Sequence, residues 1–345
     1  MGDPGGIGPE VIARTLQDPE KFSPAFLLLI GTASVFEFLE DELHLRLPLN
    51  PVPTLDPDFL RDDSVNFLDV TEEAERLLKS RAAGSSDGLF DIGRVSATNA
   101  AMALVALKAG AYQGATGLID ALVTGPVSKE AMRLVEPKFV GHTEYLAKVA
   151  RVREFAMMFL NEDPLLRVTL VTIHVPLKKV SRLITKEAVT EKIRLTHDFL
   201  KERLGIAKPR IAVCALNPHG KESGDEEEKM IATAIEDVRK DKISVSGPHS
   251  GDSIFYEAYQ GRYDAVVAMY HDQGLAPFKL VAFNTGVNLT LGLPYIRTSP
   301  DHGTAFDIAY QGRADARSME AALQCAANLV KNQKSNIKYQ NDTAK

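Results

Sequence analysis

Short apolar runs recur along the chain, and each is closely followed by Gly, Pro, Asn or His and then by a segment with a helical spacing of apolar positions. Runs of this length, rich in Val, Ile, Leu and Phe, predict buried strands, and the segments between them predict helices. Strands are expected at residues 26–30, 121–124, 155–160, 168–173, 211–216 and 265–269, and helices at 33–40, 97–110 and 145–150. Strands that alternate with helices are typical of an α/β fold.

Three of the predicted strands lead into a histidine: His174, His219 in an Asn-Pro-His sequence, and His271 after a tyrosine. Ligands of open α/β sheets bind at the carboxyl ends of strands, so these histidines are expected at a shared site. Three neutral imidazoles suit a divalent metal such as zinc, with one position left for substrate. Each histidine taken alone is better explained as a hydrogen-bonded structural residue, and the long separations leave the metal interpretation open.

The segment 270–309 concentrates polar side chains between short apolar strands and Gly/Pro turns. Such groups are costly to bury unless they bind each other, a metal or a ligand, so the segment predicts a binding site. Lys279 and Arg297 have apolar neighbours and are expected to point into a pocket, although solvated surface cations are the alternative. The polar residues of the segment are His271, Asp272, Lys279, Asn288, Arg297, Asp301, His302 and Asp307.

The sequence Asp-His-Gly-Thr-Ala-Phe-Asp-Ile-Ala at 301–309 predicts a nucleotide loop. Gly303 and Ala305 let the backbone approach an adenosine, and the carboxylate of Asp307 can accept hydrogen bonds from a ribose diol. A carboxylate there repels a 2′-phosphate, which favours NAD over NADP. The alternative is a loop capped by Asp301 and Thr304 before a helix.

Two further segments have features of ligand loops. Gly-His-Thr-Glu at 141–144 precedes a predicted helix, where His142 or Thr143 can cap the helix and an anion can bind at its N-terminus. The Gly-rich sequence at 2–10 opens a helix with Pro9 in its first turn. It lacks the G-x-G-x-x-G spacing, so an ordinary Rossmann fingerprint is absent.

Length and composition exclude several classes of protein. The 345 residues allow two domains, and the net charge of −6 without a Lys/Arg run argues against a nucleic-acid partner. No apolar stretch is long enough to span a bilayer and no signal-peptide pattern is found, so no membrane partner is expected. Cys214 and Cys325 have apolar neighbours and are expected to be reduced core residues of a cytoplasmic protein.

Seven motifs follow one another over nearly the whole chain: GDPGGIGPE, TGPVSK, GHTEYLA, NPH, AMYHDQGL, GVNLTLGLP and IRTSPDHGTAFDIA. In this order they resemble the motifs of the 4-hydroxythreonine-4-phosphate dehydrogenases of vitamin B6 biosynthesis. The first and last motifs are also similar to the N-terminal and adenosine loops of isopropylmalate and isocitrate dehydrogenases.

The resemblance implies a two-domain α/β fold of the isocitrate/isopropylmalate dehydrogenase type, with the active site in the interdomain cleft of a homodimer. The first domain would comprise residues 1–137 and 305–345, and the second residues 138–304. It implies NAD and one divalent metal ion (Zn, Mg, Co or Ni) at a site shared between subunits. Carried over, the metal ligands are His174, His219 and His271; the substrate-binding residues are His142, Thr143, Lys279, Asn288 and Arg297; the cofactor-binding residues are Gly303, Thr304, Ala305 and Asp307; and Asp252 and Lys279 are catalytic residues of unassigned role.

The implied reaction is the oxidation of 4-phosphooxy-L-threonine to a β-keto acid that loses CO2. A related branch oxidises D-threonate or D-erythronate 4-phosphate, and a more distant analogue is a dihydrodiol dicarboxylate dehydrogenase. Two loops depart from the family pattern and leave the substrate open between these branches. NPH is followed by Gly-Lys-Glu-Ser-Gly-Asp at 220–225, and a family Pro-Ala-Asp-Thr is Ser-Gly-Asp-Ser at 250–253.

Overall fold

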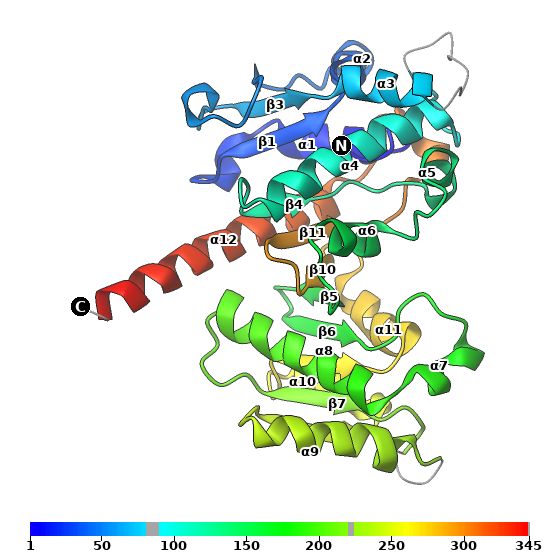
Figure 1. Cartoon of the computed structure of the whole chain (residues 1–345), viewed down its shortest axis with the longest axis vertical. Coiled ribbons are helices and arrows are strands. Elements are labelled where there is room, and N and C mark those ends of the chain that lie inside the picture. Colours follow the sequence, from blue (N-terminus) through cyan, green and yellow to red (C-terminus); the bar gives the residue numbers. More distant parts are fainter. Residues whose placement is uncertain (81–89, 220–223, 344–345) are drawn as a thin grey trace. The chain divides into compact units, whose positions relative to one another are not determined.

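A computed structural model describes residues 1–80, 90–219 and 224–343 of the chain, with side chains described as far as residue 334 (Figure 1). The chain forms two compact units. Unit 1 consists of Met1–Arg151 and Arg297–Ala327, and unit 2 consists of Val152–Ile296 with the C-terminal segment from Asn328. Both units combine helices with parallel strands, as the α/β prediction requires.

The junctions between the units differ from the predicted domain boundaries. The units change over at 151/152 and 296/297, whereas the sequence places the junctions at 137/138 and 304/305. Helix α6 (His142–Val149) contacts α4 (Ala97–Ala115), which keeps it in unit 1. Arg297 in β11 (Ile296–Pro300) donates a hydrogen bond to Thr124 of unit 1, and this contact places Arg297 in unit 1 as well.

Unit 1 is built on a parallel sheet with the strand order β1-β3-β2. In this unit β4 also lies beside β11. Its remaining helices and strands are α1 (Gly8–Leu16), β1 (Leu27–Gly31), α2 (Ala33–Leu43), β2 (Leu49–Pro51), β3 (Val65–Asp69), α3 (Thr71–Ser80), β4 (Ala121–Val123), α5 (Lys129–Val135) and the first part of α12 (Arg317–Thr343).

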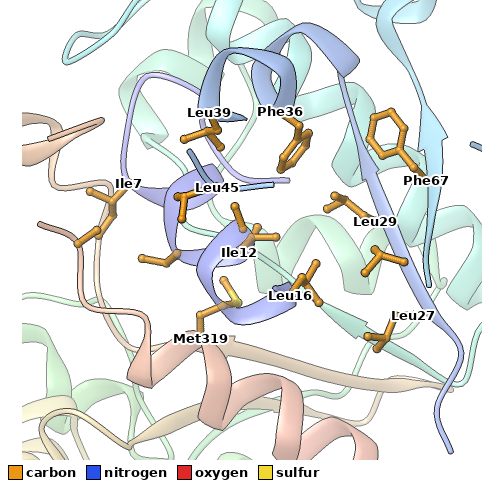
Figure 2. Close-up of a cluster of buried hydrophobic side chains, with 14 of the residues drawn as sticks. Ile7, Ile12, Leu16, Leu27, Leu29, Phe36, Leu39, Leu45, Phe67 and Met319 are labelled. Carbon is orange, nitrogen blue, oxygen red and sulfur yellow. The ribbon is translucent and has the colours of Figure 1, made fainter. Parts of the chain in front are cut away.

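The core of unit 1 forms where α1 and α2 cover this sheet (Figure 2). Ile12 and Leu16 of α1 lie between Leu29 of β1 and Met319 of α12, and all four side chains are buried. Burial of each such side chain stabilises the fold by roughly 1.5–3 kcal/mol. Helix α1 therefore holds the Gly-rich segment that precedes it in a fixed position.

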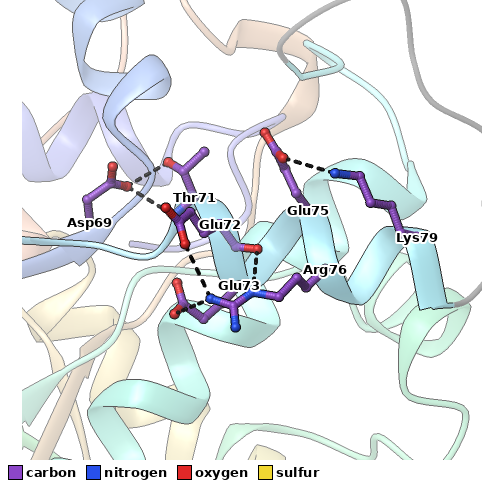
Figure 3. A network of polar contacts seen from close by, with 7 residues as sticks. All are labelled: Asp69, Thr71, Glu72, Glu73, Glu75, Arg76 and Lys79. Carbon is purple, nitrogen blue, oxygen red and sulfur yellow. Dashed lines mark hydrogen bonds and ion pairs between the residues drawn. The ribbon is translucent and has the colours of Figure 1, made fainter.

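Helix α3 presents an exposed polar surface. The Asp69 carboxylate accepts hydrogen bonds from the Thr71 N–H (3.0 Å) and hydroxyl (2.6 Å), which starts the helix. Arg76 then pairs with glutamates one turn earlier, and Lys79 pairs with Glu75 (Figure 3). These ion pairs are exposed and each contributes well under about 1 kcal/mol, so this is a solvated face rather than a site.

Unit 2 contains a mixed sheet with the strand order β10-β5-β6-β9-β7-β8. Strand β5 is antiparallel to β10 and β6, whereas β6, β9, β7 and β8 are parallel to one another. Its helices and strands are β5 (Ala156–Asn161), β6 (Leu166–Leu170), α7 (Leu177–Leu183), α8 (Lys186–Asp198), β7 (Ile211–Cys214), a π-helical turn (Glu227–Ala232), α9 (Thr233–Lys240), β8 (Val245–His249), α10 (Gly251–Tyr259), β9 (Ala265–Ala268), α11 (His271–Ala282) and β10 (Val287–Leu291).

Helix α11 corrects one expectation, because it occupies a segment where the sequence indicated strands and turns. Pro277 lies inside the helix, and an internal proline ordinarily ends one. Leu275, Phe278 and Ala282 nevertheless recur at helical spacing and are buried, and Phe278 packs on Phe159 of β5 with ring centroids 5.7 Å apart. The tertiary contacts therefore outweigh the local penalty.

Both cysteines are free and buried, as predicted. In the described parts of the chain we find no helix with the length and apolar character of a membrane span.

Candidate functional site

The carboxyl ends of the parallel strands in unit 2 bring the predicted metal-site residues to one edge. Strands β6, β9, β7 and β8 are neighbours in that order and run in the same direction, so their carboxyl ends meet at one edge of the sheet. The segments that leave these strands carry, in the same order, His174, His271, His219 and Asp252. The sheet topology thus places these four residues, each singled out from the sequence, at a common edge.

His174 and His271 are direct neighbours there. Their ring centroids are 5.9 Å apart; the side chain of His174 is exposed and that of His271 is partly buried. Nδ1 of His271 lies 2.7 Å from Oδ1 of Asp272, so the carboxylate orients this ring. A carboxylate on one imidazole nitrogen is the arrangement that commonly prepares the other nitrogen for a metal ion.

His219 and Asp252 follow the adjacent strands β7 and β8 on the other part of the edge. The Ser250 hydroxyl and the nearby His219 ring lower the pKa of Asp252, which keeps this exposed carboxylate ionised. His219 has a φ of 56°, the left-handed region that non-glycine residues seldom adopt. Strained backbone of this kind clusters at functional sites, although it does not by itself define one.

The donors at this edge suit a divalent metal in type, but one chain does not gather all three imidazoles. Among residues 1–80, 90–219 and 224–334 no group of three or more His, Cys, Asp or Glu side chains is placed to hold an ion. His271 follows β9, which lies between β6, the strand before His174, and β7, the strand before His219; the rings of His174 and His271 are in contact. The His174–His271 pair could supply two ligands of one ion.

Gln273 connects two of the strand ends at this edge. Its Oε1 accepts a hydrogen bond from the Met269 N–H (2.7 Å), and its Nε2 donates one to the Ala215 carbonyl (2.7 Å). It thereby ties the segment before His271 to the segment before His219. No pattern in the sequence distinguishes this glutamine.

Lys279 and Asn288 lie away from this histidine pair. Lys279 is two turns further along α11 than His271, roughly 12 Å along the axis, and its Nζ lies 5.7 Å from the centre of the Phe283 ring. Asn288 lies in β10, and its Oδ1 is buried without a hydrogen-bond partner among the described residues. An amide oxygen in that state is available to a donor on a ligand.

Unit 1 contains a separate set of predicted substrate residues around a buried cation. Arg297 is 3% exposed, and its Nη2 donates a hydrogen bond of 2.7 Å to the Thr124 hydroxyl. Thr143 is also buried, and His142 begins helix α6. A buried guanidinium next to a helix N-terminus is a favourable environment for a phosphate or carboxylate.

His142 is held neutral in this environment. Partial burial of the ring, with Arg297 and Lys129 nearby, lowers the pKa of His142 to about 3. Its ring contacts the edge of Phe139 at 6.3 Å between centroids. A neutral imidazole can either donate or accept a hydrogen bond, whereas the two neighbouring cations only donate.

The neutral state of His142 predicts a measurable loss of stability in acid. The unfolded chain binds a proton at His142 below about pH 6.5, whereas the folded chain binds it only near pH 3. The free energy of unfolding therefore decreases as the pH falls below 6.5. We expect the free energy of unfolding to fall by about 1–2 kcal/mol more in the wild type than in His142→Gln between pH 7.5 and pH 5. Denaturant titrations at both pH values measure this difference, with the exposed His44→Asn as control; an equal fall in wild type and His142→Gln would contradict it.

The predicted nucleotide loop lies against the Gly-rich N-terminal segment. The Ile7 N–H donates to the Thr304 carbonyl (2.8 Å), and the Asp3 N–H donates to the Pro126 carbonyl (2.8 Å). A Cβ on Gly6 would lie 2.5 Å from the Thr304 carbonyl oxygen, so only glycine allows this approach. Three motifs that are far apart in the sequence, at 2–10, 124–129 and 301–309, are therefore in contact in unit 1.

The surface of this loop is open where a cofactor is expected. A Cβ on Gly303 would meet nothing within 4 Å, and Asp307 is exposed. Ala305 adopts a left-handed conformation with φ 42°. Nε2 of His302 is buried without a hydrogen-bond partner among the described residues. These features fit a nucleotide that lies on the backbone and reaches Asp307.

Some site residues were not found from the sequence, and one predicted loop lies outside the description. Lys129 and Thr124 belong to the TGPVSK motif, but no role was assigned to either; their places beside His142 and Arg297 are structural findings. Glu227, which contacts the Asn-Pro-His loop, was missed because it lies in a run of acidic residues that reads as surface. The departure from the family pattern at 220–223 lies outside the described residues, whereas Ser250–Ser253 begins α10 at the edge described above.

The model of the family of pyridoxal phosphate biosynthetic protein PdxA matches residues 27–326 of the chain. A 4-hydroxythreonine-4-phosphate dehydrogenase of Geobacter metallireducens is 42% identical over 336 residues, which are 96% of this chain and 94% of the relative. A D-threonate 4-phosphate dehydrogenase of Pectobacterium atrosepticum is 37% identical over 341 residues, 96% and 98% of the two chains. The solved structure of a 4-hydroxythreonine-4-phosphate dehydrogenase from Klebsiella pneumoniae covers 96% of this chain and 98% of its own, with a TM-score of 0.82 and 34% identity.

Proposed function

The chain belongs to the PdxA family of pyridoxal phosphate biosynthetic proteins, and we propose on this basis that it is a metal-dependent dehydrogenase of a phosphorylated four-carbon hydroxy acid. The proposed substrate is 4-phosphooxy-L-threonine (4-hydroxythreonine 4-phosphate), and the oxidant is NAD. Oxidation of its secondary alcohol gives a β-keto acid, which loses CO2 to yield 3-amino-2-oxopropyl phosphate. The match to the family model confirms the family resemblance seen in the sequence.

The observation that carries this proposal is the carboxyl edge of β6, β9, β7 and β8. It collects His174, His271, His219 and the ionised Asp252 at the place where α/β sheets bind ligands. When bound, a divalent ion at this edge would lower the pKa of a coordinated substrate hydroxyl, and a nicotinamide ring would accept the carbinol hydride. Asp252 is exposed and ionised there, so it can accept a proton released from a hydroxyl.

The residues of unit 1 support a doubly anionic substrate. Arg297 supplies a permanent buried charge, Lys129 a second cation, and the helix that begins at His142 its N-terminal N–H groups. We propose that these groups bind a phosphate or carboxylate and that the neutral imidazole of His142 orients it. Lys279 and Asn288 of unit 2 are proposed as further substrate contacts, through a cation and an unsatisfied amide oxygen.

We propose that the protein acts as a homodimer in which histidines of both subunits complete the metal site. The ring contact supports this proposal: His174 and His271 are brought together, and among the described residues no third His, Cys, Asp or Glu side chain is placed to hold an ion with them. Unit 2 also exposes large apolar side chains on several helices, which a second subunit would cover. They are Leu177 on α7, Tyr256 on α10, and Leu280 and Phe283 at the end of α11.

A second substrate is supported by the relatives. D-Threonate 4-phosphate dehydrogenases match this chain over as great a length as the 4-hydroxythreonine-4-phosphate dehydrogenases. The segment 250–253 also departs from the family pattern Pro-Ala-Asp-Thr, which leaves the substrate open, and it includes Asp252 at the strand edge. Oxidation of D-threonate or D-erythronate 4-phosphate, with loss of CO2 to dihydroxyacetone phosphate, is therefore the alternative.

A substrate screen tests the proposal and separates the two branches. The purified chain is incubated with NAD, a divalent ion and each of 4-phosphooxy-L-threonine, D-threonate 4-phosphate and D-erythronate 4-phosphate, and NADH formation is followed by absorbance. Metal-dependent NADH formation with the first substrate is the expected result. Turnover of the sugar acids alone would select the alternative, and no NADH with any of the three would reject both.

Asp307 is expected to determine the choice of cofactor. Its exposed carboxylate can hold the ribose diol of NAD and would repel the 2′-phosphate of NADP. Asp307→Ala should raise the KM for NAD about tenfold or more and leave the KM for NADP unchanged or lower, by loss of a charge-assisted hydrogen bond. The measurement is kcat/KM with both cofactors. If the NAD/NADP ratio did not move, or if the wild type preferred NADP, the cofactor assignment of this loop would be wrong.

A further inference from the structure

A buried carboxylate holds the Asn-Pro-His loop that carries His219. Glu227 is 1% exposed, and its Oε1 accepts hydrogen bonds from the backbone N–H groups of Leu216 (2.9 Å) and Asn217 (2.7 Å). Its Oε2 accepts a third from Nδ2 of Asn217 at 3.2 Å. Both backbone donors lie after the end of β7, where the ladder no longer pairs them.

The adjacent glutamate adds to this hold. Oε2 of Glu226 accepts a hydrogen bond from Asn217 Nδ2 (3.1 Å), and its Oε1 accepts one from the Ser181 hydroxyl (2.7 Å). Consecutive side chains of an ordinary helix point in different directions. Here Glu227 begins a π-helical turn, a widened turn that often occurs at functional sites, and both carboxylates reach the same amide.

The local backbone is shaped around this contact. A Cβ on Gly224, whose φ is 93°, would lie 2.5 Å from Glu226 Oε2 and 2.7 Å from Asn217 Nδ2. His219, two residues beyond Asn217, has its left-handed φ of 56°. A non-glycine residue keeps such a conformation only where its surroundings determine it, and the three bonds to Glu227 fix the backbone immediately before it.

We propose that Glu227 is a positioning residue that holds the Asn217–His219 loop so that the His219 imidazole can bind the divalent metal. This rests on the proposed function, because it assumes that His219 is a metal ligand. Glu227 acts on His219 through the loop backbone and through Asn217 and makes no contact with substrate. Groups that orient a ligand in this way typically change metal affinity about 10–100-fold when they are removed.

The test uses Glu227→Gln, which keeps the shape of the side chain, with Glu228→Gln as matched control because Glu228 is adjacent and exposed. Zn²⁺ binding to the chelator-treated full chain is measured by calorimetry well below the melting temperature. Hydrogen exchange is followed for a peptide that contains Leu216 and Asn217. We expect the Zn²⁺ Kd of Glu227→Gln to rise about tenfold or more and exchange to accelerate at the two amides, with no change in Glu228→Gln.

If Glu227→Gln lowered the melting temperature but kept the wild-type Kd, Glu227 would have a structural role only and the proposal would be overturned. Asn217→Ala provides a second variant in case Glu227→Gln does not fold. It removes one of the three hydrogen bonds to Glu227 and leaves the buried carboxylate in place. We expect a several-fold weaker Zn²⁺ affinity in this variant, and an unchanged affinity would contradict the proposal. Failure of the proposed function is distinguishable, since it would appear as a wild-type chain whose Zn²⁺ binding does not depend on His219.

Discussion

Removal of the divalent metal is expected to stop NADH formation, and His219→Ala is expected to lower both metal content and kcat/KM by about a hundredfold or more. The physical reason is that two imidazoles cannot close a site built for three nitrogen ligands, while a hydroxyl without a bound cation keeps a pKa far above neutrality. Metal content is measured by elemental analysis after dialysis, and activity by NADH absorbance with and without chelator.

His197→Asn is a matched control for this experiment. His197 belongs to α8 in the same unit and pairs with Asp198 at 3.0 Å, away from the strand edge. Its substitution should leave metal content and rate unchanged. If His219→Ala retained the metal and the rate of the wild type, the assignment of His219 as a ligand would be wrong, whatever the chelator did.

Arg297→Ala is expected to lower kcat/KM for the phosphorylated substrate by about 30–1000-fold, or roughly 2–4 kcal/mol of transition-state binding. The guanidinium is 3% exposed, so its attraction for an anion is weakly screened by water. Kinetics are measured for wild type and variant at a temperature where both are folded, as judged by circular dichroism.

Two companion variants separate charge from packing. Arg297→Lys keeps the charge but loses the planar, two-pronged geometry, and it should recover part of the lost kcat/KM. Arg313→Ala removes an exposed arginine of the same unit and should have no kinetic effect. Loss of stability in Arg297→Ala with unchanged kinetics would show that this cation serves the fold and not the substrate.

The strands and the histidines that follow them were predictable because both depend on local patterns. Apolar runs ending before His174, His219 and His271 correspond to β6, β7 and β9, with ends that differ by one to three residues. The order of those strands was not predictable, since it depends on pairings such as Val168 with Val266 between distant segments. That order decides which two histidines are neighbours.

The residues that support the site were harder to predict than the proposed ligands. Glu227 lies in an acidic run that resembles a solvated surface, and only the π-helical turn directs it inward to the loop after β7. Helix α11 was missed because Pro277 masks the spacing of Leu275 and Phe278. In both cases long-range packing overrides what the local sequence favours.

The insertion of β9 between β6 and β7 also determines when the histidine pair can exist. The chain makes β6 and β7 first, yet neither is the other's neighbour, and both must wait for residues 265–268 to complete the sheet. Closing such long loops costs entropy before any contact is gained, so this pairing belongs to the slow part of folding. His174 and His219 therefore leave the ribosome without His271 beside either of them. Under the proposed function, a nascent chain at that stage lacks the His174–His271 pair, and we expect metal binding only after β9 has been synthesised.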